Sequence, residues 1–439
     1  MVALGRLIDA IEKADTVTFK GTITRVVGLA IESRGPVAKL GDICQIRPQH
    51  GESIPAEVVG FRDGSVLLMP LGGMDGIAPG AEVIALGHPF LVRVGKGLLG
   101  RVLNGLGKPI DGRPEPVTGT VYSANNAPPD PLLRRRITSP LGVGVRAIDS
   151  VLTCGRGQRL GIFSGSGVGK STLLGMIARN TSADVSVIAL VGERGREVKD
   201  FIEKDLGEEG LKRSVVVAAT SDQPALIRIK AAFVATAIAE FFRDQGLDVV
   251  LMMDSVTRFA MAQREVGLAI GEPPATRGYT PSVFALLPKL LERSGTAARG
   301  SVTGFYTVLV DGDDMNEPIA DAVRGILDGH IVLSRNLAAQ GHYPAIEVLQ
   351  SVSRVMIDVA TSEHISSAMK LRSVLATYKE AEDLINIGAY VPGSNPRIDY
   401  ARQMIDRVNG FLRQGIYESV SYEDAVNGLR EMFVEAEAA

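Results

Sequence analysis

The chain has 439 residues, of which 45% are hydrophobic and 22% are charged, and its formal net charge is −3. This length allows two or three domains with a sizeable core, and the composition is that of an ordinary soluble globular protein. The near-neutral charge argues against a dedicated nucleic-acid-binding protein, and the two cysteines, Cys44 and Cys154, fit a reducing cytosol rather than a disulfide framework.

The N-terminal residues 3–14 have the pattern of a short amphipathic helix. Leu4, Leu7, Ile8 and Ile11 follow the spacing of one helical face, and acidic residues interrupt any apolar core of the kind a signal peptide needs. A terminal helix this short is marginal alone, so we expect it to pack on its own domain or on a partner helix. No apolar run is long enough to cross a bilayer, so we expect any membrane association to depend on partners.

Residues 18–88 have the pattern of a small β domain. Short runs rich in β-branched residues alternate with glycine-bearing turns, and the runs are 22–27, 43–46, 56–59 and 66–69. This spacing predicts a small β-barrel. The glycine-rich segment 95–112 follows and is predicted to be a linker with several turns.

From about residue 145 the pattern changes to alternating strands and helices. The apolar runs that we expect to be strands are 160–163, 185–191, 215–219, 249–254, 305–310 and 330–333. Their nearly continuous hydrophobicity is typical of parallel strands that are covered on both faces. The sequence therefore predicts an α/β core with a mostly parallel sheet.

Beyond about residue 360 the pattern is helical. Asn395 followed by Pro396 is a helix-start signal, and Ser421 with Asp424 three positions later resembles a capping box. We therefore expect a C-terminal helical domain after the α/β core.

The most specific motif of the chain is a phosphate-binding loop, formed by Gly165, Ser166, Gly167, Val168, Gly169, Lys170, Ser171 and Thr172. It lies between an apolar run and a helix-forming segment, which is the arrangement that wraps a nucleoside triphosphate. Backbone N–H groups bind phosphate oxygens, Lys170 reaches the β- and γ-phosphates, and the Ser171 hydroxyl ligates Mg²⁺. Ser164 stands where the full pattern has its first glycine, which is a mild departure. The alternative is a glycine-rich turn with a chance Lys-Ser.

Two carboxylates are candidates for the rest of the site. Asp254 ends an apolar run, where a parallel sheet would place it at the ligand-binding edge, and the alternative is a helix-cap or turn aspartate. Glu193 follows another such run and is a candidate to orient or activate the attacking water, although its neighbours also fit a solvated charge run. Phosphoryl transfer also benefits from an arginine supplied in trans, which spacing alone cannot select.

Several further motifs make a family resemblance recognisable. They are the segments Gly-Glu-Arg-Gly-Arg-Glu-Val at 192–198, Met-Asp-Ser-Val-Thr-Arg-Phe at 253–259, Gly-Glu-Pro-Pro-Ala-Thr-Arg-Gly-Tyr at 271–279, Leu-Asp-Gly-His at 327–330 and Ser-Val-Ser-Arg at 351–354. Over about residues 20–430 the chain resembles the ATPases that drive type III protein export, with its phosphate loop closest to the flagellar form. This family is similar to the subunits of rotary ATP synthases.

The resemblance implies a RecA-like ATPase core and assigns roles at the phosphate end of the site. It implies that ATP and Mg²⁺ are bound, that Glu193 is the catalytic carboxylate, and that Asp254 is the aspartate of the Mg²⁺ site. The domains that we expect are a partner-binding segment at 1–17, the barrel at 18–88, the phosphate-loop ATPase domain at 89–355 and the helical domain at 356–439.

The resemblance also implies roles for residues that the patterns alone leave open. Arg354 matches the finger that reaches a neighbouring subunit's site, and Arg194 and Arg258 match arginines near the phosphates. Tyr343, with the proline after it, matches the segment that stacks on adenine. An aromatic residue of the C-terminal domain is expected to close that pocket, with Phe411 as one choice.

The expected assembly is a homo-hexamer with the active sites between subunits and the barrels as a crown. The family binds a stator-like regulatory protein through its N-terminal helix, and it works with export-gate membrane proteins, export chaperones and flagellar cargo. We therefore expect a cytoplasmic protein that lies at the inner face of the cytoplasmic membrane through its partners and that binds no nucleic acid.

Four alternatives stay open. An injectisome type III secretion ATPase and a rotary ATP synthase subunit share the core motifs, although a C-terminal domain of about 80 residues looks small for the second. A non-catalytic ring component would not need Glu193. An RNA translocase of the termination-factor type should expose aromatic residues on its barrel, where this chain has only Phe19 and Phe61 before Phe90.

Overall fold

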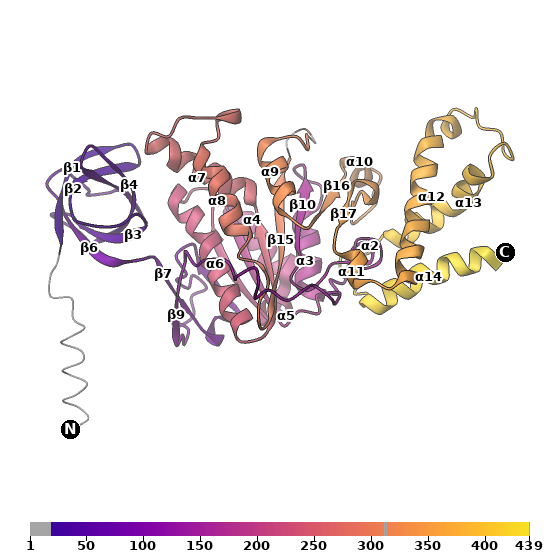
Figure 1. Ribbon diagram of the computed structural model, residues 1–439, viewed down its shortest axis with the longest axis horizontal. Coiled ribbons are helices and arrows are strands. Elements are labelled where there is room, and N and C mark those ends of the chain that lie inside the picture. Colours follow the sequence, from indigo (N-terminus) through magenta and orange to yellow (C-terminus); the bar gives the residue numbers. More distant parts are fainter. Residues whose placement is uncertain (1–18, 311, 313, 439) are drawn as a thin grey trace, which may run out of the picture. The chain divides into compact units, whose positions relative to one another are not determined.

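The structure is a computed structural model that describes residues 19–310, 312 and 314–438 (Figure 1). The amphipathic helix expected at 3–14 lies outside the described residues. The chain divides into two units, one comprising Met1–Leu91 with Glu265–Pro273 and the other comprising Val92–Arg264 with Pro274–Ala439.

The first unit contains a closed antiparallel barrel in the order β1-β2-β5-β4-β3-β6. Its strands are β1 (Lys20–Val27), β2 (Ala30–Arg34), β3 (Asp42–Arg47), β4 (Ile54–Arg62), β5 (Ser65–Pro70) and β6 (Glu82–Pro89). Inward-facing side chains such as Ile31, Cys44, Ile46 and Leu68 form its core. The barrel prediction is confirmed, although β2 and β6 were not among the predicted runs because polar residues and glycine dilute their β-branched content.

The second unit is built on a nine-stranded sheet in the order β17-β16-β10-β15-β13-β11-β12-β8, with β14 also pairing with β15. Its strands are β8 (Arg101–Asn104), β10 (Arg159–Ser164), β11 (Val185–Val191), β12 (Ser214–Ala219), β13 (Asp248–Asp254), β14 (Gly295–Thr296), β15 (Ser301–Leu309), β16 (Gly329–Leu333) and β17 (Val352–Ser353). All six predicted apolar runs are strands of this sheet. Their mutual pairing is parallel, which confirms the α/β prediction.

The prediction of a linker at 95–112 is wrong in one respect. This segment contains β8, which pairs in parallel with β12 and forms one edge of the sheet. Leu103 is fully buried, and the Arg101 guanidinium donates to Asp111 at 2.6 Å. That hydrogen bond holds the pKa of the Asp111 carboxyl well below its usual range. A buried leucine and a buried ion pair therefore turn a glycine-rich, turn-like sequence into a structural edge.

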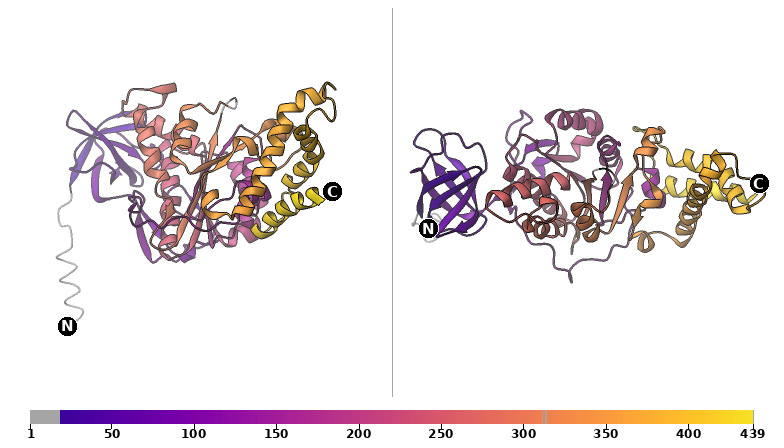
Figure 2. Two further views of the ribbon diagram at one scale, coloured as in Figure 1. Left: turned by 45° about the vertical axis from the view of Figure 1, so that its right-hand side comes forward. Right: turned by 90° about the horizontal axis from the view of Figure 1, so that it is seen from above.

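Helices connect and cover these strands (Figure 2). Those of the ATPase region are α2 (Arg146–Val151), α3 (Lys170–Asn180), α4 (Gly195–Asp200), the π-helix η2 (Phe201–Leu206), α5 (Gly207–Lys212), α6 (Ala225–Asp244), α7 (Val256–Ala269), α8 (Pro281–Leu291), α9 (Pro318–Ile326), α10 (Arg335–Ala339) and α11 (Met356–Val359), with short 3₁₀ turns at η1 (Lys96–Leu98), η3 (Thr276–Gly278) and η5 (Val348–Gln350). A separate two-stranded sheet pairs β7 (Leu91–Val94) with β9 (Thr120–Ser123).

The C-terminal region is helical, as predicted, and consists of α12 (Ser362–Asn386), α13 (Pro396–Leu412) and α14 (Tyr422–Ala438). The Asn395 side chain caps α13 by accepting from the Arg397 N–H at 3.0 Å, and the Ser421 hydroxyl accepts from the Asp424 N–H at 3.1 Å. Both predicted helix starts are therefore present.

One hydrophobic core joins the nucleotide-binding part to the C-terminal helices. It runs from strand residues such as Ile162 and Leu190 through Leu174 of α3 to Leu371 of α12 and Met404 of α13. Because these helices share this core, chain segments far apart in sequence are held against the ligand-binding edge of the sheet. Among the described residues, no helix has the length and hydropathy that crossing a membrane requires.

Candidate functional site

Three functional elements meet at the carboxyl edge of the central sheet. The phosphate loop follows β10, Glu193 follows β11, and Asp254 is the last residue of β13. Because β10, β15, β13 and β11 are neighbours and parallel, their carboxyl ends lie at the same edge. Ligands bind at this edge in open α/β sheets.

The phosphate loop has the conformation that its glycines permit. Gly169 precedes α3 with φ of 94°, a left-handed conformation that side chains rarely adopt, and its carbonyl accepts the Leu173 N–H at 3.0 Å. Lys170 and Ser171 open the helix, so their side chains and the helix N-terminus lie where phosphates would bind. Ser164 is still part of β10, which explains why a serine is tolerated at that position.

Lys170 lies between the two candidate carboxylates. Its Nζ is 2.5 Å from Asp254 Oδ1 and 3.7 Å from Glu193 Oε1, and the three side chains are 12%, 4% and 14% exposed, respectively. Asp254 also accepts the Thr307 hydroxyl at 2.8 Å. One ammonium group therefore faces two nearly buried carboxyl groups.

Glu193 has the environment of a general base. Burial raises its pKa to about 7, the negative charge of Asp254 adds to the rise, and Lys170 opposes it. Its Oε1 atom is buried and has no hydrogen-bond partner among the described residues. A carboxyl group with a pKa near neutrality and an unused oxygen is suited to accept a proton from water.

We expect this raised pKa to appear in the pH dependence of catalysis. Below its pKa of about 7, Glu193 is protonated and cannot accept a proton. The value of kcat/KM reports the free enzyme, so it should fall by about tenfold per pH unit in this range. Infrared difference spectra between the wild type and Glu193→Gln should show the protonated carboxyl appearing near the same pH. A band that appears only near the ordinary glutamate pKa of ~4.3 would contradict the expectation.

The two arginines expected near the phosphates are placed differently. Arg258, on α7, packs against Gly192 beside Glu193, and its Nε atom is buried without a hydrogen-bond partner in the described chain. Arg194 is 80% exposed and pairs with Glu197 at 3.6 Å. The structure therefore brings Arg258 to the site and leaves Arg194 at the surface.

A cavity of about 420 Å³ adjoins the phosphate loop on the side of α3. Its walls are the loop and the first turns of α3, the segment 343–345, and the segment 414–416 of the C-terminal region. The Tyr343 ring lies beside Gly169, and a Cβ on that glycine would be 3.7 Å from the ring. The size and mostly apolar lining suit a purine base.

Phe411 does not line this cavity. Its ring packs under the Arg146 guanidinium, 5.6 Å from the ring centroid, outside the pocket. The C-terminal wall is instead Gln414, Gly415 and Ile416, so the expectation that Phe411 closes the pocket is wrong.

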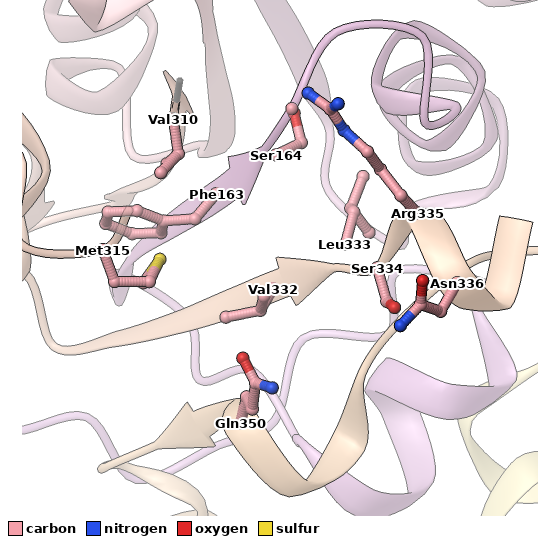
Figure 3. A pocket seen from close by; sticks show the side chains of 11 residues that line it. Phe163, Ser164, Val310, Met315, Val332, Leu333, Ser334, Arg335, Asn336 and Gln350 are labelled. Atoms are coloured by element: carbon pink, nitrogen blue, oxygen red, sulfur yellow. The ribbon is translucent and has the colours of Figure 1, made fainter. Parts of the chain in front are cut away.

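A second cavity of about 160 Å³ lies on the other side of the phosphate loop, next to β16 (Figure 3). Arg335, at the start of α10, reaches toward the chain just after Ser164 (Figure 3). A Cβ at Gly165 would be 2.5 Å from the Arg335 guanidinium, so the two groups lie close together and a larger residue there would displace the arginine side chain. The loop is thus packed on both sides by residues distant in sequence.

Arg354 lies at the opposite edge of the sheet from the phosphate loop. Ser353 of β17 pairs antiparallel with Gly329, the first residue of β16, and the Arg354 N–H donates to the Asp328 carbonyl at 3.1 Å. Since β16 is parallel to β10, Arg354 is at the amino edge, about 20 Å along the six residues of β10 from the loop. Its side chain is exposed and has no hydrogen bond or ion pair within the described chain.

The donor set at the carboxyl edge fits Mg²⁺. Mg²⁺ usually takes one or two carboxylates, waters and substrate phosphates rather than a cage of protein ligands. Ser171 and Asp254 offer a hydroxyl and a carboxylate of this kind. The Oε1 atom of Glu193, which accepts no hydrogen bond from the described residues, could accept one from a water. In the described part of the chain, no cluster of three or more His, Cys, Asp or Glu side chains offers a competing metal site.

Sequence reasoning missed two features of the site. Thr307 contacts Asp254, and a polar residue inside an otherwise apolar run was the available signal. The segment 414–416 has no motif, and only its position in the fold brings it to the cavity.

The fold and site together define a phosphate-loop nucleoside triphosphatase. Residues 144–353 match the model of the ATP synthase alpha/beta family nucleotide-binding domain, and residues 23–87 match the beta-barrel domain of the same family. Residues 360–431 match the T3SS EscN ATPase C-terminal domain. The chain belongs to the ATP synthase alpha/beta family, in the branch that contains the flagellar and type III secretion ATPases, and it is an ATP hydrolase.

Curated relatives match over nearly the whole chain. The flagellum-specific ATP synthase of Bacillus subtilis is 58% identical over 97% of this chain and 98% of its own length. The corresponding protein of Salmonella typhimurium is 51% identical over 94% of this chain and 93% of its own length. A type 3 secretion system ATPase of Sinorhizobium fredii is 49% identical over 98% of this chain and 96% of its own length.

Solved structures agree with this assignment. The assembled ATPase EscN of the enteropathogenic E. coli type III secretion system has a TM-score of 0.89 and 49% identity, over 94% of this chain and 99% of that chain. EscN in complex with its central stalk EscO has a TM-score of 0.87 and 48% identity, again over 94% of this chain and 99% of that chain.

Proposed function

We propose that this chain forms a ring that hydrolyses Mg²⁺-ATP at the interfaces between its copies and so energises type III export of flagellar proteins. The position of Arg354 supports the proposal that each site is shared between two copies. Its side chain is exposed, forms no ion pair within residues 19–310, 312 and 314–438, and lies at the edge of the sheet opposite its own phosphate loop. An arginine so placed reaches a γ-phosphate only in another copy. A repeated head-to-tail interface gives a ring when its rotation closes, and we propose that it closes here as a homo-hexamer.

Each protomer contributes most of one site. The phosphate loop and Lys170 bind the β- and γ-phosphates, and Glu193 orients the attacking water and accepts its proton. The γ-phosphoryl group passes to that water while ADP leaves with the electron pair of the broken bond. Arg354 of the next copy stabilises the charge that develops on the transferring group.

Mg²⁺ neutralises phosphate charge when it is bound, and Ser171 and Asp254 are the residues that would hold it. Lys170 forms an ion pair with Asp254. Phosphate oxygens would compete for the same ammonium, and Asp254 would then be available to hold the metal. Arg258, beside Glu193, supplies a further positive charge near the γ-phosphate, and Tyr343 stacks on the adenine.

The flagellar assignment is supported by the relatives, because flagellum-specific ATP synthases match the chain at 58% and 56% identity. The solved relative EscN binds a central stalk, EscO, which supports a stalk or stator-like partner for this ring. We propose that the ring acts in the cytoplasm beside the membrane export gate, where it releases cargo from export chaperones. The segment 1–17 is our candidate for the regulatory contact.

An injectisome function is the second candidate, because two type 3 secretion system ATPases match at 49% and 52% identity. A rotary synthase subunit is less well supported, since the C-terminal region matches the domain of the secretion ATPases.

The proposed function predicts rescue of a flagellar mutant. We expect this chain to restore swimming to a Bacillus subtilis strain that lacks its flagellum-specific ATP synthase, because the two proteins are 58% identical along their length. A Lys170→Ala variant should not restore it, since the loop would lose its phosphate-binding charge. Failure of the wild-type chain to rescue, together with restored secretion in a strain that lacks a type 3 secretion ATPase, would favour the injectisome function.

A further inference from the structure

The wall of the base cavity that comes from the C-terminal region has no regular structure of its own. Residues 414–416 follow the end of α13 and precede α14. A main-chain hydrogen bond joins this wall to the opposite wall, which is formed by residues 343–345. In this bond the Gln414 N–H donates to the Tyr343 carbonyl at 2.9 Å. Something outside the cavity must therefore fix its position.

Arg146, at the start of α2, makes that connection. Its Nη1 donates to the carbonyls of Phe411 and Arg413, both at 2.9 Å, and its Nη2 pairs with the Glu418 carboxylate. Its backbone N–H donates to the Gln414 Oε1 at 2.7 Å. Arg146 therefore bonds to the chain on both sides of residues 414–416, at Phe411 and Arg413 before them and at Glu418 after them.

The side-chain amide of Gln414 also holds the wall in place. We call Arg146, Gln414 and Glu418 together the clamp. The Gln414 Nε2 donates to the Gly144 carbonyl at 2.8 Å and to the Glu418 carbonyl at 2.9 Å, and the residue is 5% exposed. Its amide is thus committed to the protein and not to a bound base. Arg146 itself does not line the cavity, so it touches the ligand only through the wall.

We propose that Arg146 is a positioning residue that sets the affinity for the base of the nucleotide, separately from the affinity for the triphosphate. This inference rests on the proposed function, in which the 420 Å³ cavity receives the base. Loss of the guanidinium leaves the Phe411 and Arg413 carbonyls and the Glu418 carboxylate without their bonds to Arg146. Residues 414–416 stay attached, because Gln414 keeps its main-chain bond to Tyr343 and Arg179 still donates to the Ile416 carbonyl at 2.6 Å. The wall is then held by fewer bonds and positions the base less precisely. Among the described residues, the hydrogen bonds that Arg146 donates and its ring contact go to positions 411–418 and not to the phosphate loop, so we expect the loop to keep its geometry.

The test compares two ligands that share the triphosphate and differ in the base. Calorimetry with Mg²⁺ measures the Kd of adenylyl imidodiphosphate and of inorganic tripolyphosphate for the wild type and for Arg146→Met, which keeps the aliphatic stem over Phe411. We expect the first Kd to rise roughly tenfold or more and the second to stay unchanged. KM for ATP should rise while kcat remains near the wild-type value.

Two further variants test whether the change in affinity is specific to the clamp. Glu418→Gln removes the other charged end of the clamp and should shift the same Kd in the same direction by less. Arg397→Met removes an exposed arginine of α13 and should change neither Kd. Equal weakening of both ligands by Arg146→Met, or no weakening of either, would overturn the inference.

The proposed function fails in a different way. If the wild type binds neither ligand, the phosphate loop is not a nucleotide site, and both the proposed function and the inference about Arg146 are wrong. If the wild type binds both ligands with the same affinity, the loop functions but the cavity does not hold the base, and only the inference is lost.

Discussion

Replacing Glu193 by glutamine should stop ATP hydrolysis while ATP still binds. Glutamine keeps the size and shape of the side chain but cannot accept a proton, so the attacking water loses its base. A loss of about 10²- to 10⁴-fold in kcat is expected from such a group. The affinity for ATP should stay close to that of the wild type or increase, because the exchange removes a negative charge beside the γ-phosphate position. Phosphate release and equilibrium binding, measured on the same preparation, give the two values.

The control for this variant is Glu208→Gln, which changes an exposed glutamate in the first turn of α5. It should leave both kcat and affinity unchanged. Normal phosphate release by Glu193→Gln would refute the assigned role, and loss of ATP binding would mean that Glu193 supports the fold of the loop rather than the chemistry.

Replacing Arg354 by alanine should reduce kcat by about 10³- to 10⁵-fold, the range measured for arginines supplied in trans to phosphoryl transfer. The side chain is exposed and makes no hydrogen bond or ion pair within the described chain, so the isolated subunit should keep its stability. Arg299→Ala is the matched control, since Arg299 is exposed at the same amino edge of the sheet, just before β15. It should hydrolyse ATP like the wild type.

Mixing the two inactive variants tests whether the site is shared. In a ring built from Glu193→Gln and Arg354→Ala subunits, some interfaces combine an intact Glu193 from one copy with an intact Arg354 from the next. Random assortment of equal amounts restores about one interface in four. Recovered ATPase activity on mixing would support a site built by two copies. If assembled mixed rings show no recovery, Arg354 does not act in trans, and the proposed mechanism fails.

Burial is the main cause of the raised pKa of Glu193, and the negative charge of Asp254 adds to it. Asp254 lies near Glu193 because their strands are neighbours in the sheet, while the positive charges of Lys170 and Arg258 act in the opposite direction. This leaves Glu193 with a pKa of about 7. Burial first, and the neighbouring carboxylate second, thus give Glu193 a basicity suited to neutral pH.

The candidate site was predictable to the extent that its parts are local. The phosphate loop is eight consecutive residues with strict backbone requirements, and Asp254 and Glu193 each follow an apolar run. The predictions that missed a strand or misplaced a residue concern segments whose local sequence pattern is weak. The strand β8 lies in a glycine-rich stretch, and β2 and β6 mix apolar with polar residues. Phe411 was proposed for its residue type, whereas packing directs it to Arg146.

The amino-acid sequence by itself determined the chemistry and the layer architecture. Continuous apolar runs must be buried on both faces, which requires parallel strands between helices, and parallel strands bring the phosphate loop and both carboxylates to one edge. Only the tertiary structure decided which distant segments complete the site. The contact between Gln414 and Gly144 joins residues 270 positions apart, and the place of Arg354 depends on the antiparallel pairing of β17 with β16. Such relations arise from packing in one shared core, which leaves no periodicity or spacing in the chain from which they could be read.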